Sequence, residues 1–203
     1  RRAIERDELA LHYQPQISRI EGNVVGMEAL LRWRSEEIGV VSPGDFIPLP
    51  EDTGLIHPFG EWVIRQACFQ NKAWQNAGLP PVKVAGNVSA NQFKAGSGSA
   101  MVHKALADSG LAPRYLEVEL TESVMLGDSA AAEAQMAELR AMGVSLSLDD
   151  FGTGYSSLGY LSRFPLDKLK IDQTFVRNIT TGQRSAAIAP ATIALPQGLP
   201  LSE

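Results

Sequence analysis

Strand-like and helix-like segments alternate along most of this chain, and the alternation limits its possible folds more than any other feature of the sequence. The periodicities predict strands at residues 9–17, 24–32, 82–88, 115–121, 144–149 and 166–171, and helices at 60–77, 99–109, 129–142 and about 156–163. Three of these helices end on a glycine, at Gly78, Gly110 and Gly143, where a left-handed terminating residue is favoured. Helix, glycine, short loop and strand in succession are typical of repeated βα units, so we expect an α/β fold with a mainly parallel sheet.

The bulk properties of the chain exclude several classes of protein. A formal net charge of −5 argues against a protein that coats a nucleic acid polymer or a membrane surface, because such proteins present a basic face. Cys68 is the only cysteine, which excludes an internal disulfide and a cysteine-built zinc site, and its place on the apolar face of a helix indicates a buried, inert thiol. No apolar run is long enough to span a bilayer, and no signal peptide is present. Because the sequence begins with Arg1-Arg2 rather than Met, we expect a domain of a longer protein, working in the reducing environment of the cytoplasm, whose parent protein could still be membrane-anchored.

The predicted strands carry polar residues on one face and apolar residues on the other. On the strand at 115–121, for example, Glu117 and Glu119 alternate with Leu116, Val118 and Leu120. One explanation is a surface sheet with one solvated face. The other is a barrel in which helices cover the apolar faces and the polar groups point inward, gathering at the C-terminal strand ends where barrel enzymes place their chemistry. The periodicity leaves both explanations open.

The spacing of the polar groups favours a barrel. Asn87 and Glu119 are 32 residues apart and Glu119 and Asp149 are 30 apart, so each step is about one βα unit. Together with Glu28 and Asp150 these residues are hard oxygen donors, the ligands that Mg²⁺ or Mn²⁺ prefers. Carboxylates this close repel one another unless cations lie among them, and a single lysine, Lys170, cannot balance them. Two divalent metals that share Asp149 and Asp150 could balance the carboxylate charges, and paired metals suit in-line attack on a phosphate.

Six short motifs occur in a fixed order from about Leu9 to about Asn178. They are Tyr13-Gln14-Pro15, Glu28-Ala29-Leu30-Leu31-Arg32-Trp33, Asn87-Val88-Ser89-Ala90-Asn91-Gln92-Phe93, Glu119-Leu120-Thr121-Glu122-Ser123, Asp149-Asp150-Phe151-Gly152-Thr153-Gly154 and Leu169-Lys170-Ile171-Asp172. Each motif alone is weak, but six in order at the right spacing are very specific. The chain thereby resembles the EAL domain family, the cyclic di-GMP phosphodiesterases of bacterial signalling.

The resemblance implies a fold, a reaction and a set of site residues. The implied fold is a modified TIM barrel, and the implied reaction is two-metal hydrolysis of one phosphodiester bond of cyclic di-GMP to give linear pGpG. Carried over to this chain, the ligands of one Mg²⁺ or Mn²⁺ ion are Glu28, Asn87, Glu119 and Asp149, and Asp149 and Asp150 reach the second. Lys170 holds the attacking water or a phosphate oxygen, and Gln14 and Arg32 contact the dinucleotide. Glu122 anchors the loop from Asp150 to Ser157, which in the family couples the site to dimerisation. The implied partners are a second copy of the chain and an upstream sensory or GGDEF domain.

The chain departs from the family pattern toward its C-terminal end. It contains no Glu-Gly-Val-Glu motif, which in the family lies on the seventh strand and supplies a further metal-binding glutamate, usually assigned as the base. Pro190 falls inside the apolar segment at 185–195 and would cost a helix there ~3 kcal/mol. We therefore expect one EAL-type barrel over residues 1–203 that lacks its last two strands in this chain, with a linker from an upstream domain at 1–8 and a divergent or truncated tail at 179–203.

Three hypotheses for the function follow, in this order. The first is a cyclic di-GMP phosphodiesterase. The second is an inactive EAL-type module that binds the dinucleotide as a sensor or interaction domain, which the missing motif keeps open. The third is an unrelated barrel enzyme with oxygen ligands. Among the remaining residues, we expect Glu117 to be structural, Lys168 to be solvated, and Trp33 and the turn at 46–48 to serve packing.

Overall fold

The computed structural model describes residues 2–46, 56–89, 92–93, 97–126, 129–151, 164–172 and 174. Its strands are β1 (Leu9–Ile17), β2 (Val24–Ser35), β3 (Gly39–Val41), β4 (Lys83–Val88), β5 (Leu116–Thr121), β6 (Ser145–Phe151) and β7 (Lys168–Ile171). Its helices are α1 (Arg2–Glu5), α2 (Pro43–Phe46), α4 (Ile56–Asn76), α6 (Gly98–Ser109) and α7 (Ser129–Met142), with short 3₁₀ turns η1 (Pro113–Tyr115) and η2 (Glu122–Leu126).

The strands form one seven-stranded sheet in the order β1-β2-β4-β5-β6-β7, with β3 added beside β2. β1 and β2 form an antiparallel hairpin, and every later pair along the main path is parallel. The expected α/β fold with a mainly parallel sheet is therefore confirmed, and the glycines that end the three predicted helices all have positive φ angles. The sequence did not predict β3, and the helix expected at 156–163 and the tail at 179–203 lie outside the described residues.

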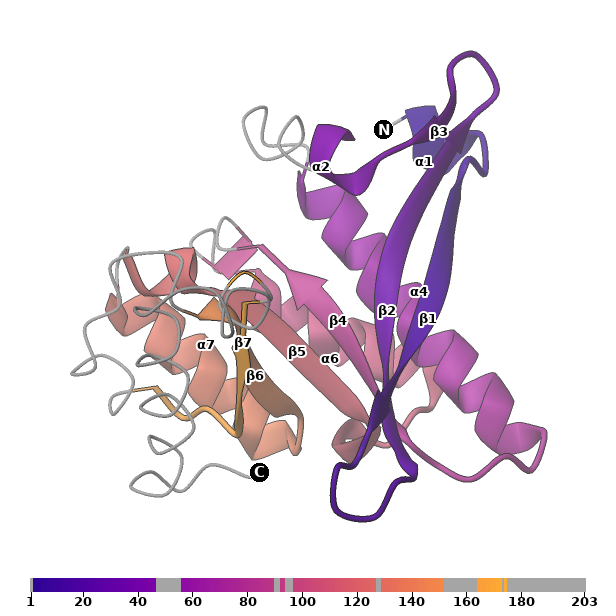
Figure 1. Ribbon diagram of the computed structural model, residues 1–203. Helices are drawn as coiled ribbons and strands as arrows, with labels where there is room; N and C mark the ends of the chain where they lie inside the picture. The colour runs from indigo at the N-terminus through magenta and orange to yellow at the C-terminus, as the bar shows by residue number, and fades with distance from the viewer. Residues whose placement is uncertain are drawn as a thin grey trace.

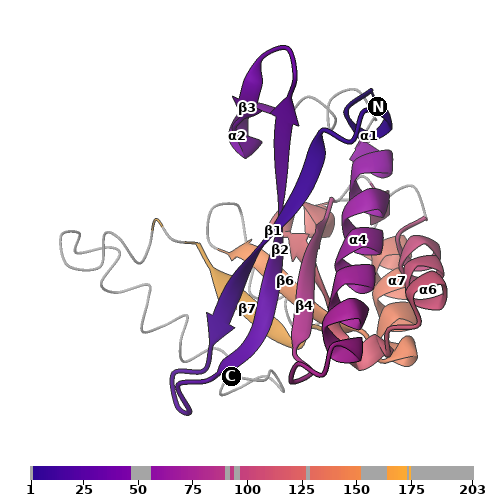
Figure 2. The ribbon, with the colours of Figure 1, turned by 90° about the vertical axis from the view of Figure 1, so that its right-hand side faces the viewer.

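The three long helices α4, α6 and α7 lie on one side of the sheet, as Figures 1 and 2 show from two directions. The apolar faces of β4, β5 and β6 meet these helices in one core, in which Ile64, Val84, Leu116 and Leu146 are completely buried. Cys68 is buried there too, and burial raises the pKa of its thiol to about 12, which confirms the expected inert cysteine. Among the described residues, no helix is long and apolar enough to cross a membrane.

The opposite face of the sheet is polar and curves into a barrel-like interior. Glu117 and Glu119 on β5 are 4% and 0% exposed although they point away from the helices. β1 and β7 stand at opposite ends of the strand order, yet Lys168 Nζ on β7 lies 2.8 Å from Gln16 Oε1 on β1. A flat sheet cannot bring its two ends into contact. The explanation of a solvated outer face is therefore wrong, and the inward-pointing arrangement is confirmed.

Gly86 on β4 packs closely against Ile64 of α4, and we expect its replacement to overpack the core. A Cβ added at Gly86 would lie 2.7 Å from Ile64 Cδ1, a completely buried atom that must then move. Gly86→Ala should therefore lower the free energy of unfolding by about 1–3 kcal/mol in urea titrations. Ile64→Val removes the clashing methyl group and alone costs about 0.5–1.5 kcal/mol. The double variant should be clearly more stable than the sum of the single effects predicts, and strict additivity would contradict this contact.

Candidate active site

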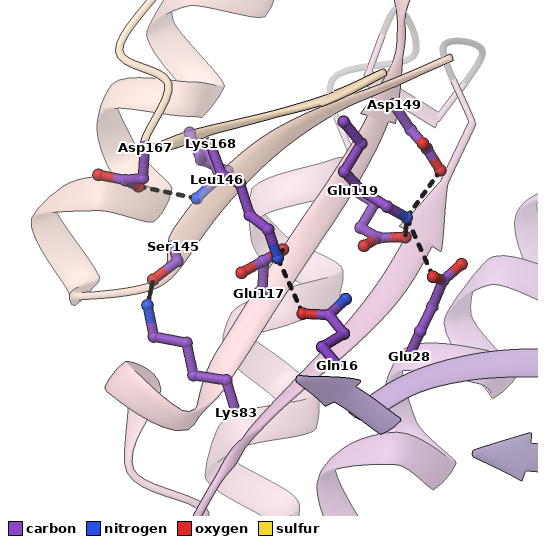
Figure 3. Close-up of polar contacts among 11 residues, drawn as sticks. Gln16, Glu28, Lys83, Glu117, Glu119, Ser145, Leu146, Asp149, Asp167 and Lys168 are labelled. Carbon is purple, nitrogen blue, oxygen red and sulfur yellow. Dashed lines mark hydrogen bonds and ion pairs between the residues drawn. The ribbon is translucent and has the colours of Figure 1, made fainter. Parts of the chain in front are cut away.

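Lys170 lies at the centre of a cluster of acidic side chains contributed by neighbouring strands. Its Nζ is 3.1 Å from Glu28 Oε2 on β2, 2.8 Å from Glu119 Oε2 on β5 and 3.0 Å from Asp149 Oδ2 on β6. Figure 3 shows the three carboxylates turned toward one point. We call these four residues the acidic cluster. All four belong to the site predicted from the sequence, and the structure brings them together across 142 residues of chain.

The parallel register explains why these residues meet. Asn87 on β4 is the Cα partner of Glu119 on β5, and Thr121, two residues further along β5, is the Cα partner of Asp149 on β6. Side chains two residues apart on a strand share a face, so Asn87, Glu119 and Asp149 project on the same side of adjacent strands near their C-terminal ends. Asn87 is exposed there, beside the cluster, and Glu28 enters from β2.

Burial gives the cluster unusual electrostatics. The Glu119 side chain is 0% exposed, and those of Glu28 and Asp149 are 19% exposed. Burial, opposed by Lys170 and assisted by the charges of Glu28 and Asp149, raises the pKa of Glu119 to about 7. For Lys170, burial alone would lower the pKa, but the charges of Glu119, Asp149 and Glu28 and the hydrogen bond to Glu119 outweigh it and raise the pKa above its usual value. The lysine is therefore a permanent cation facing three carboxyl groups.

The donor set fits a divalent cation. One carboxylate oxygen from each of Glu28, Glu119 and Asp149 lies within 4.8 Å of the others, close enough to share an ion. Oε1 of Glu119 is buried and has no hydrogen-bond partner among the described residues. An orphaned buried carboxylate oxygen is costly unless something binds it, and three carboxylates against one lysine leave a net negative charge. Hard oxygen donors of this kind suit Mg²⁺ or Mn²⁺.

A local irregularity of β6 shapes the end of the cluster. Asp150 has a φ of 55°, in the left-handed region that non-glycine residues rarely adopt, and its N–H donates to Asp149 Oδ1 at 2.9 Å. The pairing of β6 with β7 shifts register between Leu148 and Phe151, around these two residues. Burial, with the charges of Asp149 and Asp172, raises the pKa of the Asp150 carboxyl. Strained backbone of this sort is concentrated at functional sites, where the surrounding structure has to hold it in place.

A cavity of about 350 Å³ opens beside the cluster and falls within the usual size range of small-ligand sites. Its walls include the predicted residues Arg32, Asn87, Asp149 and Asp150, and further residues that the sequence did not single out, namely Pro43, Phe59, Gly60, Val63, Ser89 and Gln92. Ser89 and Gln92 lie inside a recognised motif, which could have marked them. The cavity residues on α4, which are Phe59, Gly60 and Val63, carry no such sequence signal, because their place in the wall depends on how this helix packs against the sheet.

The remaining predicted residues take varied positions. Gln14 is exposed on β1, directly opposite Glu28 in the antiparallel register, and it is not part of the cavity wall. Glu122 is buried in η2, and most of the loop that it was expected to anchor lies outside the described residues. Phe46 is buried edge-on against Trp33, with ring centroids 5.6 Å apart, which confirms the expected packing role of both.

Lys168 was expected to be solvated, and this prediction is wrong. Its Nζ donates to Gln16 Oε1 at 2.8 Å and to Glu117 Oε1 at 3.2 Å inside the curved sheet. Alternation along β7 correctly placed Lys168 on the same face as Lys170. The sequence did not show that Lys168 meets the buried Glu117 on this face.

The raised pKa of Glu119 predicts how the stability of the metal-free protein depends on pH. The pKa is about 7 in the folded protein against 4.5 for an unperturbed glutamate, so between these values the folded state keeps a proton that the unfolded chain has released. The free energy of unfolding should therefore fall as the pH rises from about 4.5 to 7, by up to ~3 kcal/mol. Urea titrations with a chelator present should show this fall in the wild type and its absence in Glu119→Gln.

The matched control for this measurement is Glu138→Gln, which makes the same chemical change at an exposed position of α7. This variant should keep the wild-type pH profile. Superimposable profiles for the wild type and Glu119→Gln would contradict the assignment of the effect to Glu119.

Comparison with known proteins identifies similar sequences over nearly the whole chain. The family model for the EAL domain matches residues 1–201. The chain is 44% identical over 201 residues to the bifunctional diguanylate cyclase/cyclic di-GMP phosphodiesterase MucR of Pseudomonas aeruginosa, covering 99% of this chain and 29% of MucR. It is 40% identical to the cyclic di-GMP phosphodiesterase PdeR of Escherichia coli, covering 99% of this chain and 30% of PdeR. The chain thus spans less than a third of the length of these relatives.

Solved structures agree with the sequence relatives. The PaMucR phosphodiesterase in complex with c-di-GMP superposes with a TM-score of 0.92 at 45% identity, over 98% of this chain and 81% of that one. The EAL domain of Mycobacterium smegmatis DcpA superposes with a TM-score of 0.76 at 31% identity, over 96% of this chain and 77% of that one. Both resemblances extend over the strands that carry the acidic cluster.

Proposed function

Because the chain belongs to the EAL domain family, we propose that it hydrolyses cyclic di-GMP to linear pGpG at the acidic cluster. The observation that carries the proposal is the convergence of Glu28, Glu119 and Asp149 on one point, next to a cavity of ligand size. Relatives named cyclic di-GMP phosphodiesterases and the c-di-GMP complex of PaMucR support the choice of substrate.

The acidic residues supply the metal sites of this proposal. Glu28, Asn87, Glu119 and Asp149 would hold one Mg²⁺ or Mn²⁺ ion, and Asp149 with Asp150 would reach a second. Ions bound there would neutralise charge on the phosphate and make a water molecule more acidic. The buried Oε1 of Glu119 has no described hydrogen-bond partner, and a bound cation would offer it one.

The cations of the chain itself orient the reaction. Lys170 Nζ is held by three carboxylates, so it can donate a hydrogen bond to a phosphate oxygen or to the attacking water from a fixed position. Arg32 lines the cavity and suits a phosphate through its planar guanidinium group, and Gln14 would contact the dinucleotide from β1. Water attacks one phosphorus atom, one P–O ester bond breaks, and the ring opens to the linear dinucleotide.

We also propose that this domain works within a longer protein. Its relatives are more than three times as long, and MucR is named as carrying both a cyclase and a phosphodiesterase activity. Residues 1–8 would then connect the barrel to an upstream sensory or GGDEF domain, and pairing of two copies would act on the site through the loop that follows Asp150.

Turnover of the dinucleotide tests the proposed function. The purified full-length protein with Mg²⁺ or Mn²⁺ should convert cyclic di-GMP to pGpG, measured by liquid chromatography, and a chelator should stop the conversion. Tight binding in calorimetry without any product would reject the enzyme and identify the non-cleaving sensor module. Neither binding nor turnover would reject both.

A further inference from the structure

A second polar layer lies beneath the acidic cluster. It consists of Gln16 on β1, Glu117 on β5 and Lys168 on β7, and we call it the lower layer. Glu117 and Lys168 each precede a member of the acidic cluster by two residues, so they project from the same faces of the same strands. Lys168 Nζ lies 3.2 Å from Glu117 Oε1 and 2.8 Å from Gln16 Oε1, and Figure 3 shows the three side chains meeting.

The two layers differ in charge. The acidic cluster opposes three carboxylates to one lysine, whereas the lower layer opposes one carboxylate to one lysine and adds a neutral amide. The side chain of Glu117 is 6% exposed and its charge is compensated by Lys168. The lower layer therefore has no need of a metal ion and can keep the same contacts whether or not the acidic cluster holds one.

Gly26 on β2 provides the space that the lower layer occupies. It lies opposite Gln16 in the antiparallel register and two residues before Glu28. A Cβ added at Gly26 would lie 3.0 Å from Gln16 Oε1 and 3.4 Å from the carbonyl oxygen of Lys83. The missing side chain lets the Gln16 amide cross β2 and reach Lys168.

The described pairing of β7 with β6 is short and irregular. β7 is only four residues long, and its sole neighbour in the described sheet order is β6. Its Cα partners on β6 are Ser147 for Lys168, Leu148 for Leu169 and Phe151 for Ile171, and Lys170 falls within the register shift. Regular pairing thus does not fix the residue that has to face three carboxylates.

We propose that the lower layer is a positioning device that ties β7 to β1 and β5 and thereby sets Lys170 and the carboxylates at cation-binding distances. Gln16, Glu117 and Lys168 are positioning residues, since they touch the reacting groups only through their strands. This inference rests on the proposed function only in that the acidic cluster binds a divalent cation.

Manganese binding to the full-length protein tests the proposal without relying on turnover. The double variant Glu117→Gln/Lys168→Met removes the ion pair without leaving one charge buried alone. Calorimetry should show 10–100-fold weaker Mn²⁺ binding than in the wild type, the usual effect of losing the groups that support metal ligands. The single variant Lys168→Arg keeps the positive charge, and its Mn²⁺ affinity should stay within a few-fold of that of the wild type.

The control is Lys83→Met, the same change at an exposed lysine that donates to Ser145 Oγ at 2.8 Å, outside both layers. It should bind Mn²⁺ as the wild type does. A cooperatively folded double variant with wild-type Mn²⁺ affinity would overturn the proposal. If the double variant does not fold, Gln16→Met provides the test, because it leaves the ion pair between Glu117 and Lys168 in place. Gln16→Met should bind Mn²⁺ several-fold more weakly than the wild type. Unchanged Mn²⁺ binding by this variant would also overturn the proposal. A wild type that binds no Mn²⁺ would instead refute the proposed function itself.

Discussion

Glu119→Gln should lower the rate of cyclic di-GMP hydrolysis by about a thousandfold. Glu119 is the completely buried member of the acidic cluster, and glutamine keeps its shape while removing its charge. A bound cation would lose an anionic ligand, including the Oε1 atom that has no described hydrogen-bond partner. Loss of several kcal/mol of charge stabilisation, at about 1.4 kcal/mol for each factor of ten, corresponds to roughly three orders of magnitude in kcat.

The same substitution should not destabilise the metal-free protein at pH 8. Burial already disfavours the ionised carboxylate, as the pKa of about 7 indicates, so an uncharged amide of equal size costs little there. Thermal unfolding with a chelator should therefore give a melting temperature at or above that of the wild type, while product formation with Mn²⁺ collapses. Glu138→Gln on the surface of α7 should change neither quantity. Retention of more than a tenth of the wild-type kcat by Glu119→Gln would refute the role given to Glu119.

The sequence could identify the members of the acidic cluster because strand periodicity and unit spacing are local properties. Alternation placed Glu119 on the polar face of its strand, and the 32- and 30-residue steps placed Asn87 and Asp149 on adjacent strands. The observed register, with Asn87 opposite Glu119 and Thr121 opposite Asp149, confirms both. Parallel pairing then brings the C-terminal ends of these strands, and with them the three side chains, to the same edge of the sheet.

The unit spacing favoured a barrel with an inward polar face, but the side chains that meet across that face could not be predicted in the same way. Alternation assigns a side chain to a face and does not say what it contacts there, because that depends on the twist summed over all strands. Lys168 therefore looked like any lysine on a wet face, and its contact with Gln16, 152 residues earlier, was missed. The positive φ of Asp150 was missed for a related reason, since it coincides with a register shift that involves a second strand.

Lys170→Met should strongly destabilise the metal-free protein. The Lys170 side chain is 20% exposed and is the only described cation in contact with Glu28, Glu119 and Asp149. Removing one partner of a buried ion pair costs about 3–5 kcal/mol, because the other charge is left uncompensated. For a domain of this size the melting temperature should fall on the order of 10 °C with a chelator present. The loss should be larger at pH 8 than at pH 6, where protonation of Glu119 relieves the repulsion.

A divalent cation should restore much of this stability, because it would supply to the three carboxylates the positive charge that Lys170 provides in its absence. Saturating Mn²⁺ should thus raise the melting temperature of Lys170→Met by more than it raises that of the wild type. The variant should still hydrolyse cyclic di-GMP poorly, because it lacks the donor that orients water or phosphate. Lys104→Met is the control, since Lys104 pairs with Asp108 at 2.9 Å on the surface of α6, where such pairs contribute little. Equal Mn²⁺ stabilisation of variant and wild type would mean that the metal binds elsewhere. A larger effect in the variant would establish that lysine and metal compensate the same charges, so that the lysine keeps the acidic cluster folded until the metal arrives.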